Sequence, residues 1–236
     1  MKPDPDRTGF DEILRRVRTA VANPALAADR RLPGETRLAG ETEFLGNALV
    51  ARWQQEFRAL SGHAYGPLTP AAAVGQARDL LVARGAHQVL AWDDKALPVP
   101  NLSQALAAVG IETIHPQVNT DPAALDHVPV GITGASAGLA DTGSIIVTSG
   151  PGRPRSASLV PPVHLAFLRI SRIYPDLPAW MTRQGAGLLP QTANLVIITG
   201  PSRTADIELT LVVGVHGPGE IHVILIDETA ADDPIG

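Results

Sequence analysis

The spacing of apolar residues changes near residues 67–70 and divides the chain into two patterns. Before this point apolar residues recur every three or four positions, which predicts helix alone. One predicted helix covers Asp11–Val21, and Ala25–Ala39 is interpreted as an irregular connector. A second helix carries one apolar stripe that we expect to be a packing surface, with any exposed part available to another subunit. The stripe consists of Leu45, Leu49, Trp53, Phe57 and Leu60.

Downstream of residue 67 the pattern predicts alternating helices and strands. Thr69 is a good N-cap before Pro70, and Gly85 suits the left-handed turn that ends a helix. Another helix is expected between Asn101 and Gly110. The predicted strands are short apolar runs rich in Val and Ile. They cover His87–Trp92, Ile111–Ile114, Val128–Thr133, Ser144–Thr148, Leu165–Ile170, Leu195–Thr199 and Ile221–Ile226.

Several of these strands are continuously apolar rather than alternating, which indicates a sheet covered on both faces and therefore mostly parallel. We expect an α/β fold, a doubly wound sheet with helices on both faces over residues 67–236. A helical N-terminal extension is expected over residues 1–66. Two neighbouring pairs of segments leave antiparallel or mixed pairing open. They are Ser144–Thr148 with Leu165–Ile170, and Glu208–Val213 with Ile221–Ile226.

Composition narrows the functional classes. The 236 residues include 19 Lys and Arg against 24 Asp and Glu, a net charge of −5. This balance argues against a nucleic-acid-binding surface, which usually shows a basic excess. The longest apolar runs fall far short of the roughly 20 residues that a membrane span needs. Because the acidic start also lacks the apolar segment of a secretory signal, we expect a cytoplasmic protein.

Cysteine is absent from the sequence. The chain therefore cannot form a disulfide, use a thiolate nucleophile or hold a Cys-ligated zinc ion or iron–sulfur cluster of its own. No P-loop and no dinucleotide-binding glycine motif follows a predicted strand. None of the seven histidines falls in a recognised metal-binding spacing. Convergence of His164, His216 and His222 stays open, but neutral hydrogen-bonded histidines are commoner, so no metal site is predicted.

The segment from Gly200 to Glu208 is the first candidate site. It follows the end of a predicted strand, and ligands of open α/β sheets lie beyond the carboxyl ends of strands. Hydroxyl groups, a guanidinium and free backbone N–H groups suit a carboxylate or phosphate. The expected anion-binding residues are Gly200, Ser202, Arg203, Thr204, Asp206 and Glu208. The alternative is a capped turn in which Arg203 pairs with Asp206 or Glu208.

Asp141–His164 is the second candidate site. Asp141 stands before a predicted strand, where a carboxylate acts as a general base or ligand anchor, or caps a backbone turn. Arg155 is a candidate for ligand or structural pairing, whereas Arg153 is interpreted as solvent-exposed. His216, between Gly-Val and Gly-Pro, is the best candidate for a functional imidazole, followed by His164. Asp141 and His216 are therefore the candidate catalytic residues.

Gly134–Gly138 matches the G-x-S-x-G pattern of a serine hydrolase, with Ser136 in the nucleophile position. An Asp and a His lie downstream in the hydrolase order. No upstream segment resembles an oxyanion hole, and five-residue matches built from Gly, Ala and Ser arise easily. A Ser136 nucleophile is not expected.

Two stretches resemble the LUD (lactate-utilisation) family. In the first, an acidic-Thr-Gly turn at Asp141 leads into a strand, followed by Arg155, a Ser-Leu-x-Pro segment that begins at Ser158, and His164. In the second, Gly200–Glu208 is followed by Gly214–Pro218. The first stretch departs from the family pattern, because Asp replaces a usual Glu at 141 and Pro-Pro-Val-His replaces a usual Pro-Glu-Thr-His before 164. The resemblance is most specific over residues 128–226.

The resemblance implies a Rossmann-like fold of the NagB/RpiA/CoA-transferase group, with ligands at the carboxyl ends of the strands. It also implies one subunit of a system that oxidises L-lactate to pyruvate. Iron–sulfur clusters are then expected on partner proteins, and no cofactor on this chain. Arg155, Ser158 and His164 would join the residues that bind a small carboxylate.

Two other hypotheses stay open. One is a stand-alone CoA- or sugar-phosphate-type transferase or isomerase, suggested by fold analogy alone. The other is a non-catalytic scaffold for iron–sulfur partners. The sequence leaves the oligomeric state open.

Overall fold

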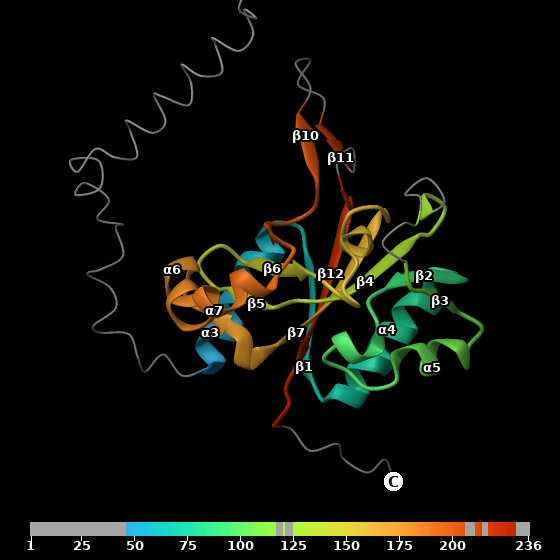
Figure 1. The fold of residues 1–236 in the computed structure, drawn as a ribbon, viewed down its shortest axis with the longest axis horizontal. Helices are drawn as coiled ribbons and strands as arrows, with labels where there is room; N and C mark the ends of the chain where they lie inside the picture. The colour runs from blue at the N-terminus through green and yellow to red at the C-terminus, as the bar shows by residue number, and fades with distance from the viewer. Residues whose placement is uncertain (1–45, 117–119, 121–124, 206–210, 214–216, 230–236) are drawn as a thin grey trace, which may run out of the picture. The chain divides into compact units, whose positions relative to one another are not determined.

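A computed structural model describes most of the chain after residue 45 (Figure 1). The described residues are 46–116, 120, 125–205, 211–213 and 217–229. All of them belong to one compact unit that spans residues 44–236.

The main element of this unit is a six-stranded sheet in which all neighbouring strands are parallel. Its strand order is β1-β12-β7-β4-β2-β3. The strands are β1 (His63–Leu68), β2 (Gln88–Ala91), β3 (Glu112–Ile114), β4 (Val130–Gly134), β7 (Val163–Arg169) and β12 (Glu220–Ile226). The central strands are buried along their length, which agrees with their continuously apolar sequences.

A second sheet of four strands has the order β8-β5-β6-β9. Its strands are β5 (Ala137–Leu139), β6 (Ser144–Ser149), β8 (Ile173–Tyr174) and β9 (Asn194–Ile198). Within it β5 pairs in parallel with β8, whereas β6 pairs antiparallel with β5 and β9. A separate antiparallel pair joins β10 (Arg203–Ala205) to β11 (Leu211–Val213).

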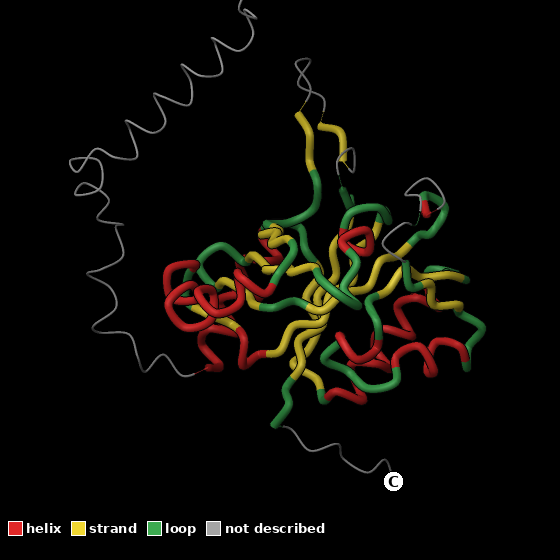
Figure 2. The backbone as a smooth tube through the Cα atoms, in the orientation of Figure 1, coloured by secondary structure: helices red, strands yellow, loops and turns green. Residues whose placement is uncertain are grey.

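The helices lie on two sides of the six-stranded sheet. Helices α4 and α5 lie on one side, and α3, α6 and α7 lie on the other with the four-stranded sheet (Figures 1 and 2). The α-helices are α3 (Gly46–Ala59), α4 (Pro70–Ala83), α5 (Leu102–Ala107), α6 (Leu177–Trp180) and α7 (Ala186–Leu188). Shorter turns are η1 (Asp94–Ala96), η3 (Arg155–Ser158), η4 (Ile170–Arg172), the π-helical η5 (Met181–Gly185) and η6 (Leu189–Gln191).

The predicted α/β class, the mostly parallel sheet and all seven predicted strands are confirmed. Helix α4 begins as expected, because the Thr69 hydroxyl accepts the N–H of Ala72 at 3.2 Å. Gly85 follows this helix with a φ of +64°. Asn101 precedes α5 with a φ of 51°, but its side chain makes no capping hydrogen bond.

Three features differ from the expectation. The prediction of helix alone before residue 67 is wrong at β1, so the expected boundary at residues 66 and 67 falls inside a strand. This strand was missed because it is an exposed edge strand that contains Gly66-Pro67. The open strand pairings are also resolved differently: β6 pairs with β5 and β9 rather than with β7, and β11 pairs with β10 rather than with β12.

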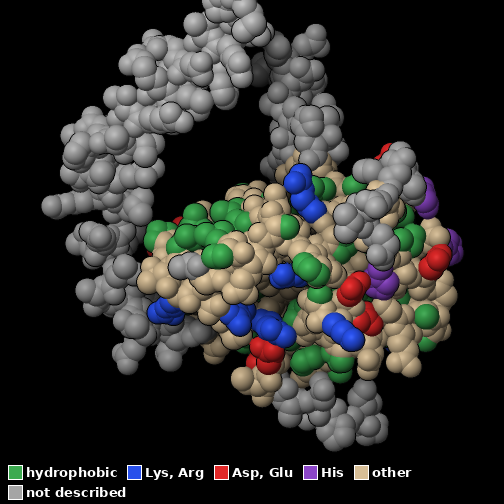
Figure 3. All heavy atoms as spheres, viewed as in Figure 1, with side chains coloured by type: hydrophobic (Ala, Val, Ile, Leu, Met, Phe, Trp, Pro, Cys, Tyr) green, Lys and Arg blue, Asp and Glu red, His purple; other side chains and the backbone are tan. Residues whose placement is uncertain are grey.

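The middle of the apolar stripe on α3 belongs to the core. Trp53 and Phe57 are fully buried, with ring centroids 4.8 Å apart, and the indole N–H of Trp53 donates to the Ser144 carbonyl at 2.9 Å. These two side chains are therefore closed to another subunit. Exposed hydrophobic side chains gather instead near α6 and α7, as the space-filling view shows (Figure 3). They include Leu177, Met181 and Leu189.

No helix in the described part of the chain is long and apolar enough to cross a membrane.

Candidate functional site

The topology of the six-stranded sheet points to a ligand crevice between β2 and β4. From β2 the chain continues outward to the edge strand β3, whereas from β4 it continues in the opposite direction to β7. In open parallel sheets the carboxyl ends of the strands at such a reversal form the ligand-binding crevice.

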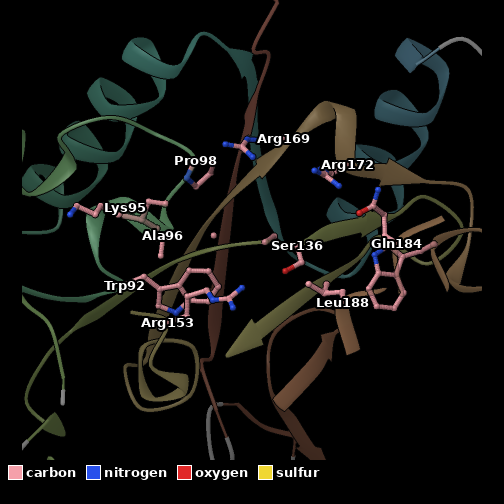
Figure 4. Close-up of a pocket in the computed structure, with 14 residues that line it drawn as sticks. Trp92, Lys95, Ala96, Pro98, Ser136, Arg153, Arg169, Arg172, Gln184 and Leu188 are labelled. Carbon is pink, nitrogen blue, oxygen red and sulfur yellow. The ribbon is translucent and has the colours of Figure 1, made fainter. Parts of the chain in front are cut away.

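A cavity of about 330 Å³ occupies this place, and we call it the basic cavity (Figure 4). The segment after β2, the end of β4 and the end of β7 each contribute to its wall. Its chemistry comes from four basic side chains, two indoles, one hydroxyl and one amide. These are Lys95, Arg153, Arg169, Arg172, Trp92, Trp180, Ser136 and Gln184.

The charge of the basic cavity is mostly uncompensated. Among the described residues, no carboxylate lines it. Arg169 is partly neutralised, since its Nε lies 2.8 Å from Oε1 of Glu228. Arg153 and Arg172 have no carboxylate partner in the described part of the chain. A ligand with one or more anionic oxygens fits such a wall, because guanidinium groups form short, charge-assisted hydrogen bonds with them.

Ser136 lies between two groups of basic side chains, with Arg169 and Arg172 on one side and Arg153 on the other (Figure 4). Its Oγ is 2.8 Å from Oγ1 of Thr148, which accepts a hydrogen bond from Nη1 of Arg153 at 3.2 Å. Within the described residues, no histidine contacts this serine. A Ser-His nucleophile, already disfavoured by the sequence, therefore gains no support here.

Sequence reasoning missed the basic cavity. Arg153, interpreted as solvent-exposed, is half-buried and bonded to Thr148. A signal was available at Arg169 and Arg172, which stand at and just beyond the end of a predicted apolar strand. Ligand-binding residues gather at such positions in parallel sheets.

Four of the predicted anion-binding residues do come together. Ser158, His164, Gly200 and Ser202 line one cavity of about 210 Å³, the histidine cavity. It lies at the beginning of β7 and β12, since His164 is the second residue of one and Ile221 the second of the other. This edge is opposite to the edge that holds the basic cavity. Gly200 still follows the carboxyl end of a strand, but that strand is β9 of the smaller sheet.

The histidine cavity offers hydroxyl groups and an uncharged imidazole. His164 is fully buried, and its Nε2 lies 2.8 Å from the Thr133 hydroxyl, whereas Nδ1 has no hydrogen-bond partner among the described residues. Burial lowers the pKa of His164 from 6.5 to about 4. The imidazole is therefore neutral at pH 7, and the described lining of this cavity includes no charged side chain.

The buried imidazole predicts acid sensitivity. Its folded-state pKa lies below the unfolded value, so the unfolded chain binds the proton more tightly, and stability falls as the pH drops from about 6.5 to 4. The full contribution is about 3 kcal/mol. Urea unfolding at pH 7 and pH 5 should show a smaller loss for His164→Gln than for the wild type. The exposed His127→Gln control should keep the wild-type loss, and an equal loss in all three proteins would contradict the assignment.

The remaining predicted residues are dispersed or undescribed. Asp141 is exposed, and its backbone N–H donates to the Pro175 carbonyl at 3.0 Å. Arg155 is exposed at the start of η3 and lines a third cavity of about 670 Å³, whose wall shares Arg153 with the basic cavity. The backbone of Arg203 and Thr204 lies in β10, but their side chains are outside the description. Asp206, Glu208 and His216 lie outside the described residues, so their predicted roles stay predictions.

A histidine cluster joins the beginnings of β1 and β12. Ligand atoms of His63, Glu220 and His222 lie within 4.8 Å of one another. Arg84 bonds to Glu220 and to Nε2 of His222, and the Tyr65 hydroxyl lies 3.0 Å from Nδ1. Burial would raise the pKa of Glu220, but hydrogen bonds from Arg84 and His222 outweigh it and lower the pKa. Because the guanidinium already compensates the carboxylate, the cluster serves as an ion-pair network between the end of α4 and β12.

His164 and His222 do not converge, so the possibility that they share one metal site is wrong. His164 is the register partner of Ile221, and His222 is the partner of Leu165. Successive residues of a strand point to opposite faces of a sheet. The two imidazoles therefore lie on opposite faces and do not form one metal site.

Comparisons with known proteins agree with this architecture. A lactate utilization protein C from Halalkalibacterium halodurans is 32% identical over 150 residues, which cover 61% of this chain and 64% of that protein. An uncharacterised Neisseria meningitidis protein is 37% identical over 42% of this chain and 43% of its own length. The chain thus spans less than two thirds of these relatives. A crystal structure of a DUF162 family protein from Deinococcus radiodurans has the same fold, with a TM-score of 0.58 at 18% identity over 77% of this chain and 98% of that chain.

The model of the LUD domain matches residues 63–226, which run from the first residue of β1 to the last residue of β12. The match therefore covers the whole six-stranded sheet and both cavities. This chain belongs to the LUD domain family.

Proposed function

We propose that this chain takes part in L-lactate utilisation as a subunit that binds a small carboxylate in the basic cavity. Membership of the LUD domain family and the lactate utilization protein C among its relatives support the metabolic role. Arg153, Arg169 and Arg172, at the carboxyl edge of the parallel sheet and without a lining carboxylate among the described residues, support the binding role.

Small 2-hydroxy and 2-oxo acids match this cavity in charge. A carboxylate accepts two hydrogen bonds from one guanidinium, and a second guanidinium fixes its orientation. Arg172 is the best anchor, since it is half-buried and has no carboxylate partner in the described part of the chain. Trp92 and Trp180 supply apolar surface beside these cations, which suits the carbon chain of the ligand.

Oxidation of a hydroxy acid needs an electron acceptor. Without cysteine this chain cannot ligate an iron–sulfur cluster through thiolates. The proposal therefore assigns electron transfer to iron–sulfur partner proteins in the cytoplasm and assigns carboxylate binding to this subunit.

Removal of Arg172 should weaken carboxylate binding. In titration calorimetry with L-lactate and with pyruvate, Arg172→Ala should raise Kd roughly 10- to 100-fold, as expected for the loss of a hydrogen bond between charged groups. Arg78→Ala is the matched control, since Arg78 is exposed on α4 and pairs with Asp79. It removes the same charge but should leave Kd unchanged.

The same titration separates the basic cavity from the predicted Gly200–Glu208 loop. If that loop binds the anion, Arg203→Ala rather than Arg172→Ala will raise Kd. If neither acid binds the wild-type protein, carboxylate binding by the isolated subunit is refuted. The metabolic role is tested separately by deletion of the gene in a host without another lactate dehydrogenase. Growth on L-lactate should stop, and normal growth would exclude the role.

A further inference from the structure

Three hydrogen-bonding groups form a chain with a defined direction: Arg153 and Ser136 line the basic cavity, and the fully buried Thr148 joins them from behind its wall. Nη1 of Arg153 lies 3.2 Å from Oγ1 of Thr148, and Oγ1 of Thr148 lies 2.8 Å from Oγ of Ser136. A guanidinium can only donate, so Thr148 accepts from Arg153. The direction of the second bond then depends on where the single hydroxyl proton of Thr148 points.

Burial settles that direction. Thr148 is fully buried, and among the described residues its hydroxyl has no acceptor other than Ser136. A buried hydroxyl proton without an acceptor is unfavourable, so Thr148 donates to Ser136. Ser136 is half-buried and lines the cavity, where its own proton has a ligand as an acceptor. The chain therefore runs from Arg153 through Thr148 to Ser136 and ends as a donor that faces the ligand.

The charged groups around Ser136 have the same character, and the amide of Gln184 is the one neutral donor and acceptor that shares this wall among the labelled side chains of Figure 4. Arg153, Arg169 and Arg172 surround it and are donors only (Figure 4). Its backbone N–H donates to the Ile146 carbonyl at 2.7 Å, which fixes the position of the residue. The centre of the cavity thus presents donors from several directions to a ligand that lies against Ser136.

We infer that Ser136 is a specificity-determining residue that makes the basic cavity prefer a 2-oxo acid to the corresponding 2-hydroxy acid. This inference rests on the proposed carboxylate-binding function. The carbonyl oxygen of a 2-oxo acid only accepts hydrogen bonds, so it matches the Ser136 proton while the carboxylate meets the arginines. The hydroxyl of a 2-hydroxy acid brings a proton of its own against the Ser136 proton and against guanidinium groups that can only donate. In the proposed lactate pathway the preferred ligand is therefore the product of the oxidation, pyruvate, rather than the substrate.

The inference is tested by the ratio of two dissociation constants, L-lactate over pyruvate, measured by titration calorimetry. The wild-type ratio is expected to be roughly 10, the effect of one net hydrogen bond. Ser136→Ala should bring the ratio close to 1, chiefly through weaker pyruvate binding. Acetate, which has the carboxylate but no 2-oxygen, should bind wild type and Ser136→Ala equally.

Two variants of Thr148 distinguish the effect of the hydrogen-bond chain on specificity from the effect of side-chain packing. Thr148→Val keeps the shape of the side chain but removes the hydroxyl, so it should lower the ratio as Ser136→Ala does. Thr148→Ser retains the hydroxyl and should restore the wild-type ratio. A general packing defect would change acetate binding as well.

The outcomes distinguish this inference from the proposed function. If the wild type binds neither acid, the binding function fails and the inference fails with it. If both acids bind with equal affinity and Ser136→Ala changes neither, the specificity role is overturned while carboxylate binding stands. If pyruvate is preferred but Thr148→Val retains that preference, the directed chain is overturned.

Discussion

Gly131→Ala is expected to prevent stable folding, the largest effect of any single substitution considered for this protein. Gly131 lies in the central strand β4, and η3 passes directly over it. A Cβ at this position would lie 1.8 Å from the Ala157 carbonyl oxygen and 3.1 Å from Cγ of Pro161. The closest atom belongs to the backbone, so no side-chain rotation relieves the clash.

The expected cost is more than about 4 kcal/mol, since η3 must move away from the sheet as a unit. A domain with a total stability of about 5–15 kcal/mol loses much of its folded population at such a cost. The measurement is soluble yield, followed by urea unfolding monitored by far-UV circular dichroism. Gly75→Ala in helix α4 is the matched control. A Cβ there meets nothing within 4 Å, and the helix should gain roughly 0.5–1 kcal/mol. Equal stability of the two variants would show that η3 is not held against β4 as described.

Trp53→Ala should cost about 3–5 kcal/mol, the usual range for a large aromatic side chain removed from a core. Trp53 is fully buried, stacks on Phe57 and donates its indole N–H to the Ser144 carbonyl. The substitution therefore removes apolar burial, an aromatic contact and the partner of a buried carbonyl together. It should weaken the attachment of α3 to β6, the strand that also carries Thr148, the hydrogen-bond partner of Ser136 and Arg153.

A graded pair of variants separates these contributions. Trp53→Phe keeps an aromatic ring but leaves the Ser144 carbonyl without its indole donor, at an expected cost of about 1–3 kcal/mol. Arg52→Ala, exposed on the same helix, should change stability by less than about 0.5 kcal/mol. Far-UV circular dichroism during urea unfolding gives all three values. A Trp53→Ala midpoint equal to that of the wild type would contradict the core position of α3.

The sequence predicted the central strands well because a strand covered on both faces carries a local signature. Val89, Ile132 and Phe167 are completely buried, and each stands in a continuous apolar run. β1 lacks this signature, since His63, Gly66 and Pro67 are exposed on an edge strand. The pairing of β6 with β9 was also out of reach, because partners about 50 residues apart are chosen by packing rather than by local pattern.

The residues of the candidate sites also differ in how far the sequence predicted them. Two sequence motifs predicted that Ser158, His164, Gly200 and Ser202 share one anion site. The structure places these four residues around one cavity, and their role in binding stays a prediction. The basic cavity draws single residues from separate segments, among them Trp92, Ser136 and Arg172. The end of a predicted strand marked Arg169 and Arg172 as candidates, but no local pattern showed that Trp92, Ser136 and Arg153 face them, so only the folded topology reveals the cluster.

The edge position of β1 has a consequence for synthesis of the protein. Its partner in the sheet is β12, so residues 63–68 pair with residues 222–226, near the other end of the family domain. A growing chain leaves the ribosome at about 5–20 residues per second, so β1 waits roughly 10 s or more for its partner. Throughout that interval its hydrogen-bonding edge is open to other chains. We expect nascent chains that end before residue 220 to depend on chaperones. This dependence should end when β12 emerges from the ribosome.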